Sequence, residues 1–387
     1  MMRSKEYRLL LIGDFYSIYI INYVKSLKRE NPHARISFWG TDREHEGDND
    51  PDYLKCFEKY HLFSINEIYS KFSPVKSLYS IYLLRKDFMS FVKSEKFDFI
   101  NIHFVLYKYS FLIDIFKRVS SNLVLSPWGS DVYRIGRTEK FLLRFLYKSA
   151  DFISGQDDKF TKDVMCLFDI PKSKLVPVLL GSATVDYILE NIGTVSEKDA
   201  KSKMGLDGAY VITCGYNASP AQQHVRIIDA INSVRTELPE NLVLLFPFTY
   251  NGNPEYTNEI KRKIKESNLT ALFYEDFLDL PELFLLRQAT DIFIHMQLSD
   301  AGSSSLREYM LCGKKVINGS WLRYEELEKD GSIPYFIAKD FESLGMTIVS
   351  AYKSTPISIS DYVYKVLERK GTKFTIARTN NFFCEIV

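Results

Sequence analysis

The sequence lacks several features that mark common classes of protein. Its five cysteines are odd in number and scattered, without the spacing of metal ligands, so they indicate neither a disulfide framework nor a zinc site. Basic and acidic residues nearly balance, at 50 and 49, which argues against a dedicated nucleic-acid-binding protein. No apolar window approaches the roughly 18 residues of a spanning helix, and the N-terminal apolar stretch is too short for a signal peptide. These absences predict a reduced, cytoplasmic protein that binds no nucleic acid.

Two domains are expected from the length and from the order of the apolar segments. A chain of 387 residues exceeds what one hydrophobic core usually covers. Apolar runs alternate with helical patterns, which is typical of parallel sheets with helices on both faces. The alternation pauses after 176–181, which is the predicted linker. The predicted strands are 7–12, 36–39, 99–103, 123–126 and 152–155 before the linker, and 210–214, 242–246, 271–274, 292–294 and 316–317 after it.

The most informative segment is 291–317, which reads DIFIHMQLSDAGSSSLREYMLCGKKVI. The pattern predicts a buried strand at 292–294, a loop of small residues at 301–305 and then an amphipathic helix. The first turn of such a helix has unpaired N–H groups at the positive end of its dipole, where an anion is stabilised. Gly302 lets a ligand come close, and a carboxylate at Glu308 can accept hydrogen bonds from ribose hydroxyls. The segment therefore predicts a phosphate site.

An ordinary strand-to-helix turn explains the same pattern without a ligand. In that alternative, Ser303 caps the helix and Glu308 lies on a solvated face. Taken alone, the segment leaves both interpretations open.

The segment also resembles the donor-binding signature of GT-B glycosyltransferases, especially the retaining enzymes of family 4. Asp300 and Glu308 stand eight positions apart, as the two acids of that signature do, and EYMLCGKKVI follows in register. Asp300 replaces the usual Glu, AlaGlySer replaces GlyPheGly, and Lys315 replaces Pro. The resemblance implies a donor site formed by Gly215, Asn217, Asp300, Ala301, Gly302, Ser303, Ser304, Ser305 and Glu308.

Two loops of the first half resemble a subset of family 4 that contains the letters WGSD. HFVLYKYSFL follows the strand that ends at His103, and PWGSDVYR follows the next strand. Trp128 stands where several relatives carry a histidine near the donor sugar, which casts doubt on an imidazole-based mechanism there. Asp131 would orient acceptor hydroxyls or stabilise positive charge on the sugar. The implied catalytic residues are His103, Asp131 and Asp300. A histidine satisfied within the core and an aspartate that caps a helix are the alternatives for the first two.

The first loop, GDFYSIYIINYV, resembles the acceptor side of similar enzymes. Tyr19 replaces the usual His, and Asn22 and Tyr23 replace ArgTrp. The implied acceptor residues are Asp14, Ser17, Tyr19 and Trp128. A helix entrance with Ser17 as its cap is the alternative.

The loop that opens the second half, CGYNASPAQQHVRIIDAI, departs most from the family. Family 4 enzymes usually place Arg and Lys here to grip the donor diphosphate, whereas this chain offers Gly215, Asn217 and neutral amides. Backbone N–H groups and amide side chains can bind phosphate with less Coulombic attraction. This loop and PFTYNGNPEY also resemble 4-acetamido-4-deoxy-fucose transferases, which invert the anomeric centre, so the stereochemical outcome stays open. His224, which closes the loop, is part of this resemblance. Packing at a helix start is the alternative for it.

The resemblance implies an α/β fold of GT-B architecture, with two Rossmann-like domains whose parallel sheets face each other across a cleft. The expected limits are 1–180 for an acceptor domain and 181–355 for a nucleotide-sugar donor domain. A third segment, 356–387, would carry a helix at 360–370, capped by Ser360, and cross back to the first domain.

The implied function is transfer of a sugar from a nucleotide-diphosphate donor to a glycan or lipid-linked acceptor in bacterial surface polysaccharide synthesis, with retention preferred. The transition state carries positive charge on the ring and negative charge on the departing diphosphate. No cofactor or metal is expected, because GT-B enzymes commonly use helix dipoles in place of a metal. The DxD-like triplet Asp48-Asn49-Asp50 lies in a charged run and reads as a solvated loop.

Two other classes of function stay open. An epimerase can share the fold but needs a converging acid/base pair, and a nucleotide-sugar-binding module needs no catalysis. A lipid-linked acceptor would bring peripheral contact with the inner face of the cell membrane. The cations expected to assist are Lys25, Lys28, Arg29, Lys71 and Lys76, for which a solvated surface is the alternative.

Overall fold

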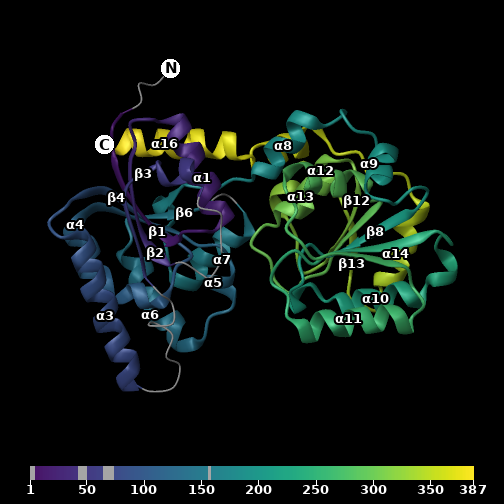
Figure 1. Cartoon of the computed structure of the whole chain (residues 1–387). Helices are drawn as coiled ribbons and strands as arrows, with labels where there is room; N and C mark the ends of the chain where they lie inside the picture. The colour runs from purple at the N-terminus through teal and green to yellow at the C-terminus, as the bar shows by residue number, and fades with distance from the viewer. Residues whose placement is uncertain (1–4, 42–49, 64–73, 156–157) are drawn as a thin grey trace. The chain divides into compact units, whose positions relative to one another are not determined.

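The computed structural model describes residues 5–41, 50–63, 74–155 and 158–387, with the backbone alone for 74–77. The chain forms two compact units (Figure 1). The first unit consists of Met1–Gly181 with Thr372–Val387, and the second consists of Ser182–Gly371. Among the described residues, no helix is both long and apolar enough to cross a membrane.

The first unit is built on a seven-stranded parallel sheet of order β3-β2-β1-β4-β5-β6-β7. Side chains of a strand alternate between its two faces, so Leu9 and Leu11 enter one core while Leu10 and Ile12 enter the other. The strands are β1 (Arg8–Asp14), β2 (Arg35–Thr41), β3 (Phe57–Phe63), β4 (Phe97–His103), β5 (Ser120–Ser126), β6 (Phe152–Ser154) and β7 (Leu175–Val176).

Helices cover both faces of this sheet. On one face α1, α2 and α16 supply the apolar side chains of the core, and on the other α3 to α7 do so. Figure 1 shows α16, in yellow, beside α1, in purple, and the Tyr7 hydroxyl donates to Asn380 Oδ1 at 3.1 Å. The helices are α1 (Ile18–Glu30), α2 (Pro51–Leu54), α3 (Pro74–Val92), α4 (Ile113–Val119), α5 (Ser130–Tyr133), α6 (Arg137–Ser149), α7 (Lys159–Phe168) and α16 (Thr372–Ile386), with the 3-10 helices η2 (Tyr107–Leu112) and η3 (Lys172–Lys174).

The second unit has a six-stranded parallel sheet of order β10-β9-β8-β11-β12-β13. β8 and β11 are neighbours at its centre, so the loops after these two strands emerge side by side at the carboxyl edge. The strands are β8 (Tyr210–Cys214), β9 (Leu242–Pro247), β10 (Ala271–Tyr274), β11 (Ile292–His295), β12 (Lys315–Gly319) and β13 (Phe336–Ala338).

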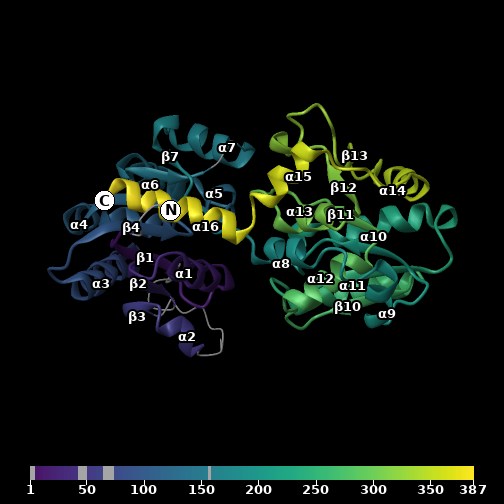
Figure 2. The same ribbon diagram turned by 90° about the horizontal axis from the view of Figure 1, so that it is seen from above.

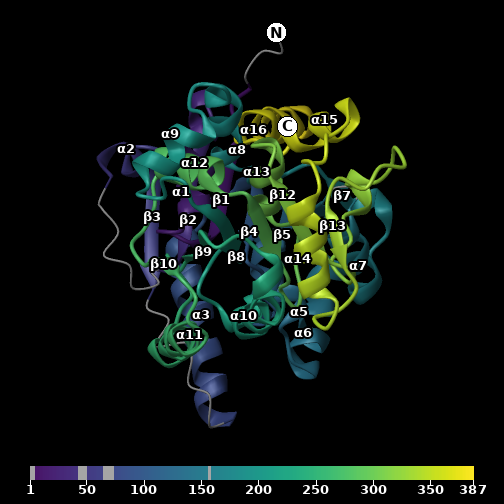
Figure 3. The same cartoon turned by 90° about the vertical axis from the view of Figure 1, so that its right-hand side faces the viewer.

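The helices of the second unit also form two layers. Figures 1 and 3 show α10, α11 and α14 on one face of the sheet and α8, α12 and α13 on the other. Figure 2 shows α8, α13 and α15 gathered on one side of the unit. The helices are α8 (Ala183–Asn191), α9 (Glu197–Lys203), α10 (His224–Ser233), α11 (Pro254–Glu266), α12 (Leu280–Ala289), α13 (Ser304–Leu311), α14 (Leu344–Lys353) and α15 (Asp361–Glu368), with the 3-10 helices η4 (Pro220–Gln222), η5 (Arg235–Glu237) and η6 (Glu325–Leu327).

Every predicted strand is present, two of them, 210–214 and 271–274, with the predicted limits. The sequence patterns missed β3, β7 and β13, which are short or lie at a sheet edge. The C-terminal segment is divided differently from the expected 356–387. Its helix α15 is capped by Ser360, as predicted, but belongs to the second unit. The helix that joins the first unit is α16, which was not predicted.

Candidate functional site

The predicted phosphate loop connects β11 to α13 in the second unit. Asp300 Oδ2 accepts hydrogen bonds from the backbone N–H groups of Gly302 at 3.0 Å and Ser303 at 2.7 Å, and from the Tyr324 hydroxyl. A carboxylate beside a helix N-terminus is stabilised by the helix dipole. Asp300 therefore shapes the loop with one oxygen, and within the described residues its Oδ1 accepts no hydrogen bond.

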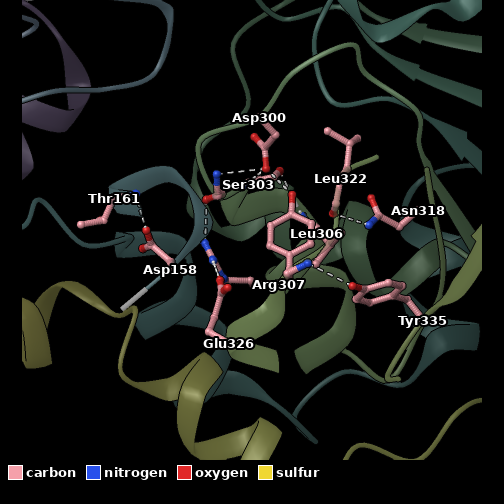
Figure 4. A network of polar contacts seen from close by, with 12 residues as sticks. Asp158, Thr161, Asp300, Ser303, Leu306, Arg307, Asn318, Leu322, Glu326 and Tyr335 are labelled. Atoms are coloured by element: carbon pink, nitrogen blue, oxygen red, sulfur yellow. Dashed lines mark hydrogen bonds and ion pairs between the residues drawn. The ribbon is translucent and has the colours of Figure 1, made fainter. Parts of the chain in front are cut away.

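Arg307 braces the same loop from within α13. Its Nη1 donates to Gly302 O at 2.6 Å, and its Nη2 donates to Glu326 Oε1 at 2.8 Å. Gly302 has a φ of 104°, and a side chain there would meet the Arg307 guanidinium at 3.3 Å, so the position requires glycine. Figure 4 shows Arg307 bonded to Glu326 and to the loop that carries Asp300 and Ser303. The loop is thus held from both sides by buried polar contacts.

The first turn of α13 offers two N–H groups that these contacts do not use. Ser303 Oγ caps the helix by accepting from Leu306 N–H at 3.4 Å, as in the ligand-free alternative drawn from the sequence. In the part of the chain that the structure describes, the N–H groups of Ser304 and Ser305 have no acceptor. Unpaired N–H groups at a helix start bind anions, so cap and anion site coexist here.

Glu308 is buried and paired with a cation. Its Oε2 accepts from Arg287 Nε at 3.1 Å and from Nη2 at 2.9 Å, while Ser182 Oγ lies 3.4 Å from Oε1. The alternative that places Glu308 on a solvated face is therefore wrong. Burial lowers the pKa of Arg287, but Tyr309 and the Glu308 carboxylate together raise it above its usual value. A ribose at this position would compete with Ser182 for Oε1.

The loop after β8 lies beside the loop after β11. Gly215 has a φ of 68°, and a side chain there would come within 3.0 Å of Gln222 Oε1. Asn217 is buried, and its Oδ1 accepts from Ser219 N–H at 2.9 Å. The Asn217 side chain thus shapes the loop, and the two predicted donor residues share one turn. His224 is buried at the start of α10, as the packing alternative expected, and burial lowers its pKa to about 3.

In the first unit, His103 ends β4 with its ring buried. Neither ring nitrogen has a hydrogen-bond partner among the described residues, and burial lowers the pKa of His103 to about 3. Its ring packs against Tyr23 at 5.2 Å and Trp128 at 6.3 Å between centroids. His103 is therefore neutral at physiological pH and is not satisfied by the core, contrary to the core alternative.

The structure brings three predicted residues of the first unit together. Tyr19 packs edge-on against Trp128 at 5.7 Å, and Trp128 contacts His103. Nearby Phe104 adopts a left-handed φ of 59°, a strained conformation that often occurs at functional sites. Trp128 Nε1 is buried without a partner in the described chain. These residues form a candidate acceptor site, in which Tyr19 is exposed and the His103 nitrogens are buried.

Asp14 and Ser17 lie at the entrance to α1. Asp14 ends β1, and its backbone oxygen accepts from Ser17 N–H at 3.3 Å. Ser17 occupies the capping position, but its hydroxyl makes no capping hydrogen bond. The alternative that placed Ser17 at the helix entrance is right about its position. The expected capping hydrogen bond is not formed.

Asp131 is buried and bonded to the backbone of two loops. Its Oδ1 accepts from Trp128 N–H at 2.9 Å and from Gly129 N–H at 2.8 Å, and its Oδ2 accepts from Val105 N–H at 2.7 Å. Burial raises the pKa of Asp131, while these three donors favour its ionised form. The geometry gives Asp131 a positioning role, because it fixes the loop after β5 against the loop after β4.

The described residues contain no group of three or more His, Cys, Asp or Glu side chains that could hold a metal ion. Of the DxD-like triplet, positions 48 and 49 lie outside the described residues. Asp50 caps α2 and pairs with Lys25 at 2.8 Å. This residue therefore has a structural role.

Sequence patterns did not indicate several residues that build the site. Arg287 and Arg307 are buried partners of the two predicted loops, and Tyr324 holds Asp300 from a distant part of the chain. Gln297 lies within the informative segment and was not singled out. A polar residue shortly after a buried strand, such as Gln297 two residues after β11, was the available signal.

No protein-family model and no curated protein sequence matches the chain. Solved structures match it over nearly its full length. A glycosyltransferase from Rickettsia africae aligns with a TM-score of 0.70 and 12% identity, covering 99% of both chains. HepE from Anabaena, in complex with UDP and glucose, aligns with a TM-score of 0.67 and 12% identity, covering 99% of this chain and 100% of that chain. A UDP-forming α,α-trehalose-phosphate synthase from Burkholderia xenovorans aligns with a TM-score of 0.68 and 10% identity, covering 99% of both chains.

The chain has the GT-B fold. The predicted α/β architecture of two Rossmann-like domains with parallel sheets is confirmed. At these identities the match shows the fold alone, so membership of family 4 and kinship with the acetamido-fucose transferases stay predictions.

Proposed function

We propose that the protein is a glycosyltransferase that moves a sugar from a nucleoside-diphosphate donor to a glycan or lipid-linked acceptor. The observation that carries the proposal is the start of α13, where two unused N–H groups lie beside the free Oδ1 of Asp300. The N–H groups suit diphosphate oxygens, and the carboxylate oxygen suits a sugar hydroxyl. UDP is the first nucleotide to test, because HepE is described with UDP and with UDP-glucose.

The mechanism follows from where charge develops. As the glycosidic bond breaks, negative charge grows on the diphosphate and is stabilised by Ser304 N–H, Ser305 N–H and the α13 dipole. No metal is needed for this step. Positive charge grows on the ring, and Asp300 Oδ1 stabilises it. Retention is the proposed outcome, on the strength of the resemblance to family 4.

The acceptor binds to the first unit beside His103, Tyr19 and Trp128. Aromatic rings pack against the apolar face of a sugar. The neutral imidazole of His103 can donate a hydrogen bond to a sugar hydroxyl or accept one from it. The pathway that we propose is bacterial surface polysaccharide synthesis. A lipid-linked acceptor would bring this reaction to the inner face of the cell membrane.

Membrane contact is assigned to α6 rather than to most of the cations named from the sequence. Lys25 pairs with Asp50, Lys28 donates to two backbone oxygens, and Lys71 lies outside the described residues. The side chain of Lys76 also lies outside them. On α6, the exposed rings of Phe141 and Phe145 contact each other edge to face. The exposed cations around them are Arg137, Lys140 and Arg144, together with Lys148, which pairs with Asp169 at 3.1 Å. Aromatic rings flanked by cations suit an anionic lipid surface.

The test is a calorimetric screen of the protein against UDP, GDP, dTDP, ADP and CMP, with inorganic phosphate as control, followed by product analysis. Ser304→Pro removes one N–H at the first helical position, where proline is well tolerated. We expect this variant to bind the nucleotide about tenfold more weakly, equivalent to about 1.4 kcal/mol, with its thermal stability kept.

Ser304→Ala keeps the N–H and is the matched control. Equal affinities of the two variants would contradict the diphosphate assignment. Conversion of a nucleotide sugar to its epimer without transfer would favour the epimerase alternative, and binding without turnover on any acceptor would favour the binding module.

A further inference from the structure

Two buried glutamines join the loops at the carboxyl edge of the second sheet. Gln222 lies before α10, and Gln297 follows β11. Gln222 Nε2 donates to Gln297 Oε1 at 3.1 Å, and the Tyr216 hydroxyl bonds to the same oxygen at 3.0 Å. The Trp321 indole N–H donates to the Gln297 backbone oxygen at 2.9 Å. Side chains from three segments, the loop after β8, the loop after β11 and the segment after β12, thus fix this amide pair.

The pair leaves one acceptor and one donor unused. Gln222 Oε1 and Gln297 Nε2 are both buried and have no hydrogen-bond partner in the described chain. Exchanging oxygen and nitrogen in both amides leaves the same result, because one amide then still donates to the other. A buried polar group without a partner costs free energy, and most such groups in proteins are satisfied by protein, water or ligand.

The unused groups suit a neutral ligand group better than a phosphate. An ionised phosphate presents acceptors alone, so it would be repelled by Gln222 Oε1. A hydroxyl both donates and accepts, so it suits Gln222 Oε1 as a donor and Gln297 Nε2 as an acceptor. The loop from 215 to 224 contains no Arg or Lys, and the nearest following cation, Arg226, lies over the Phe341 ring at 3.6 Å. The loop therefore offers no cation for the diphosphate and has neutral amides instead.

The pair lies beside the proposed donor site. Tyr216, which bonds to Gln297, is close enough to Asp300 for that carboxylate to raise the pKa of the tyrosine, in addition to the larger effect of burial. Gly215 allows the close approach of Gln222, because a side chain there would meet Gln222 Oε1 at 3.0 Å. Both unused atoms are buried beside the partly exposed Tyr216, so the inference requires a side-chain shift that admits the ligand.

We infer that the Gln222–Gln297 pair is a specificity site that recognises a hydroxyl of the donor sugar. The inference rests on the proposed function and goes beyond it, because it assigns recognition of the sugar to two amides in place of cations on the diphosphate. A site built to hydrogen-bond a hydroxyl discriminates strongly against a ligand that lacks it.

The experiment compares the affinities of UDP and UDP-glucose by calorimetry in the wild type and in Gln297→Leu and Gln222→Leu. We expect the ratio of the two dissociation constants to shift against UDP-glucose by about 10-fold or more, with UDP affinity changed by less than about 3-fold. Gln288→Leu, a buried glutamine on α12, is the matched control and should leave both affinities unchanged. Thermal unfolding of each variant verifies its fold.

Deoxy analogues of UDP-glucose then identify the hydroxyl. The analogue that lacks it should bind equally to wild type and Gln297→Leu, whereas the other analogues should still bind the variant more weakly. An unchanged affinity ratio, or equal losses for UDP and UDP-glucose, would overturn the inference and leave the proposed function standing. A wild-type protein that binds no nucleotide and no nucleotide sugar would overturn both.

Discussion

At the carboxyl edge of the second sheet, buried charged side chains form ion pairs, whereas at the same edge of the first sheet a buried histidine has no hydrogen-bond partner among the described residues. Glu308 pairs with Arg287 and Arg307 pairs with Glu326 in the second unit. In the first unit, both nitrogens of His103 and Asn101 Oδ1 have no partner among the described residues. The charged side chains of the second edge are preorganised by their own contacts, whereas its glutamine pair and the first edge keep hydrogen-bonding capacity for a ligand.

This difference suits the two substrates of the proposed reaction. A nucleoside diphosphate carries fixed charge and needs rigid N–H groups, which the braced loop after β11 provides. A sugar acceptor is neutral and is recognised by rings and single polar atoms, which His103 and Trp128 provide. The contrast predicts that the same kind of substitution has different consequences in the two units.

The largest effect is expected at the buried ion pair. Glu308→Ala leaves the Arg287 guanidinium buried without its carboxylate, so the free energy of unfolding should fall by about 3–5 kcal/mol. Urea denaturation measures it. The contrasting substitution, His103→Leu in the first unit, removes unpaired nitrogens and should change stability by less than about 1 kcal/mol.

A double variant, Arg287→Met with Glu308→Leu, is the control and should recover most of the loss. If Glu308→Ala and His103→Leu destabilised the protein equally, the contrast between the two edges would fail. Because Glu308→Ala combines loss of stability with loss of any ribose contact, Glu308→Gln is the better variant for nucleotide binding.

Acid should destabilise the chain through its buried histidines. Burial lowers the pKa of His103 and of His224 to about 3, against 6.5 for the unfolded side chain. Between these values the unfolded state binds more protons, so stability rises with pH and is lost as pH falls from 6.5 towards 3. Each histidine contributes a slope of about 1.4 kcal/mol per pH unit.

The measurement is the free energy of unfolding from pH 7 to pH 4 in the wild type, His103→Leu and His224→Leu. In each variant the slope of the free energy of unfolding against pH should fall by the contribution of one histidine. This difference separates the histidines from the acidic groups that titrate in the same range. Replacement of the exposed His33 is the control. A slope that is unchanged in His103→Leu would show that this imidazole is not held neutral.

The fold could be predicted from the sequence because its central strands are continuous apolar runs buried on both faces. β8 (Tyr210–Cys214) and β10 (Ala271–Tyr274) have the predicted limits. β3 was missed because its side chains are mostly half-exposed, which breaks the apolar run, and β7 because it has two residues. α16 was missed because polar residues such as Asn380 are buried on the face that packs on α1.

The candidate site was predictable where one loop carries it and not where distant residues complete it. Asp300 and Ser303 lie in one segment, and their roles as loop and cap follow from local geometry. Tyr324, which bonds to Asp300, and Arg287, which bonds to Glu308, come from elsewhere in the chain. Local patterns carry no information about such contacts, which depend on the packing of α12 and of the segment after β12.

The smallest effect is expected at the surface of α6, where charges act one at a time. Phe141 and Phe145 are 61% and 53% exposed, and Lys140 and Arg144 lie beside them. Arg144→Gln should weaken binding to vesicles of phosphatidylglycerol and phosphatidylcholine by about 1 kcal/mol, with stability changed by less than about 0.5 kcal/mol. Vesicle sedimentation measures the binding.

Lys265→Gln, an exposed position on α11 of the second unit, is the matched control and should leave vesicle binding unchanged. Vesicles of phosphatidylcholine alone should bind the wild type more weakly, because they lack the anionic headgroups that attract α6. Equal losses for Arg144→Gln and Lys265→Gln would mean that any surface cation suffices, and the assignment of membrane contact to the first unit would fall. A selective loss at Arg144 would place the lipid-linked acceptor and the unpaired polar atoms of the first sheet in the same unit, as the division of roles between the two edges requires.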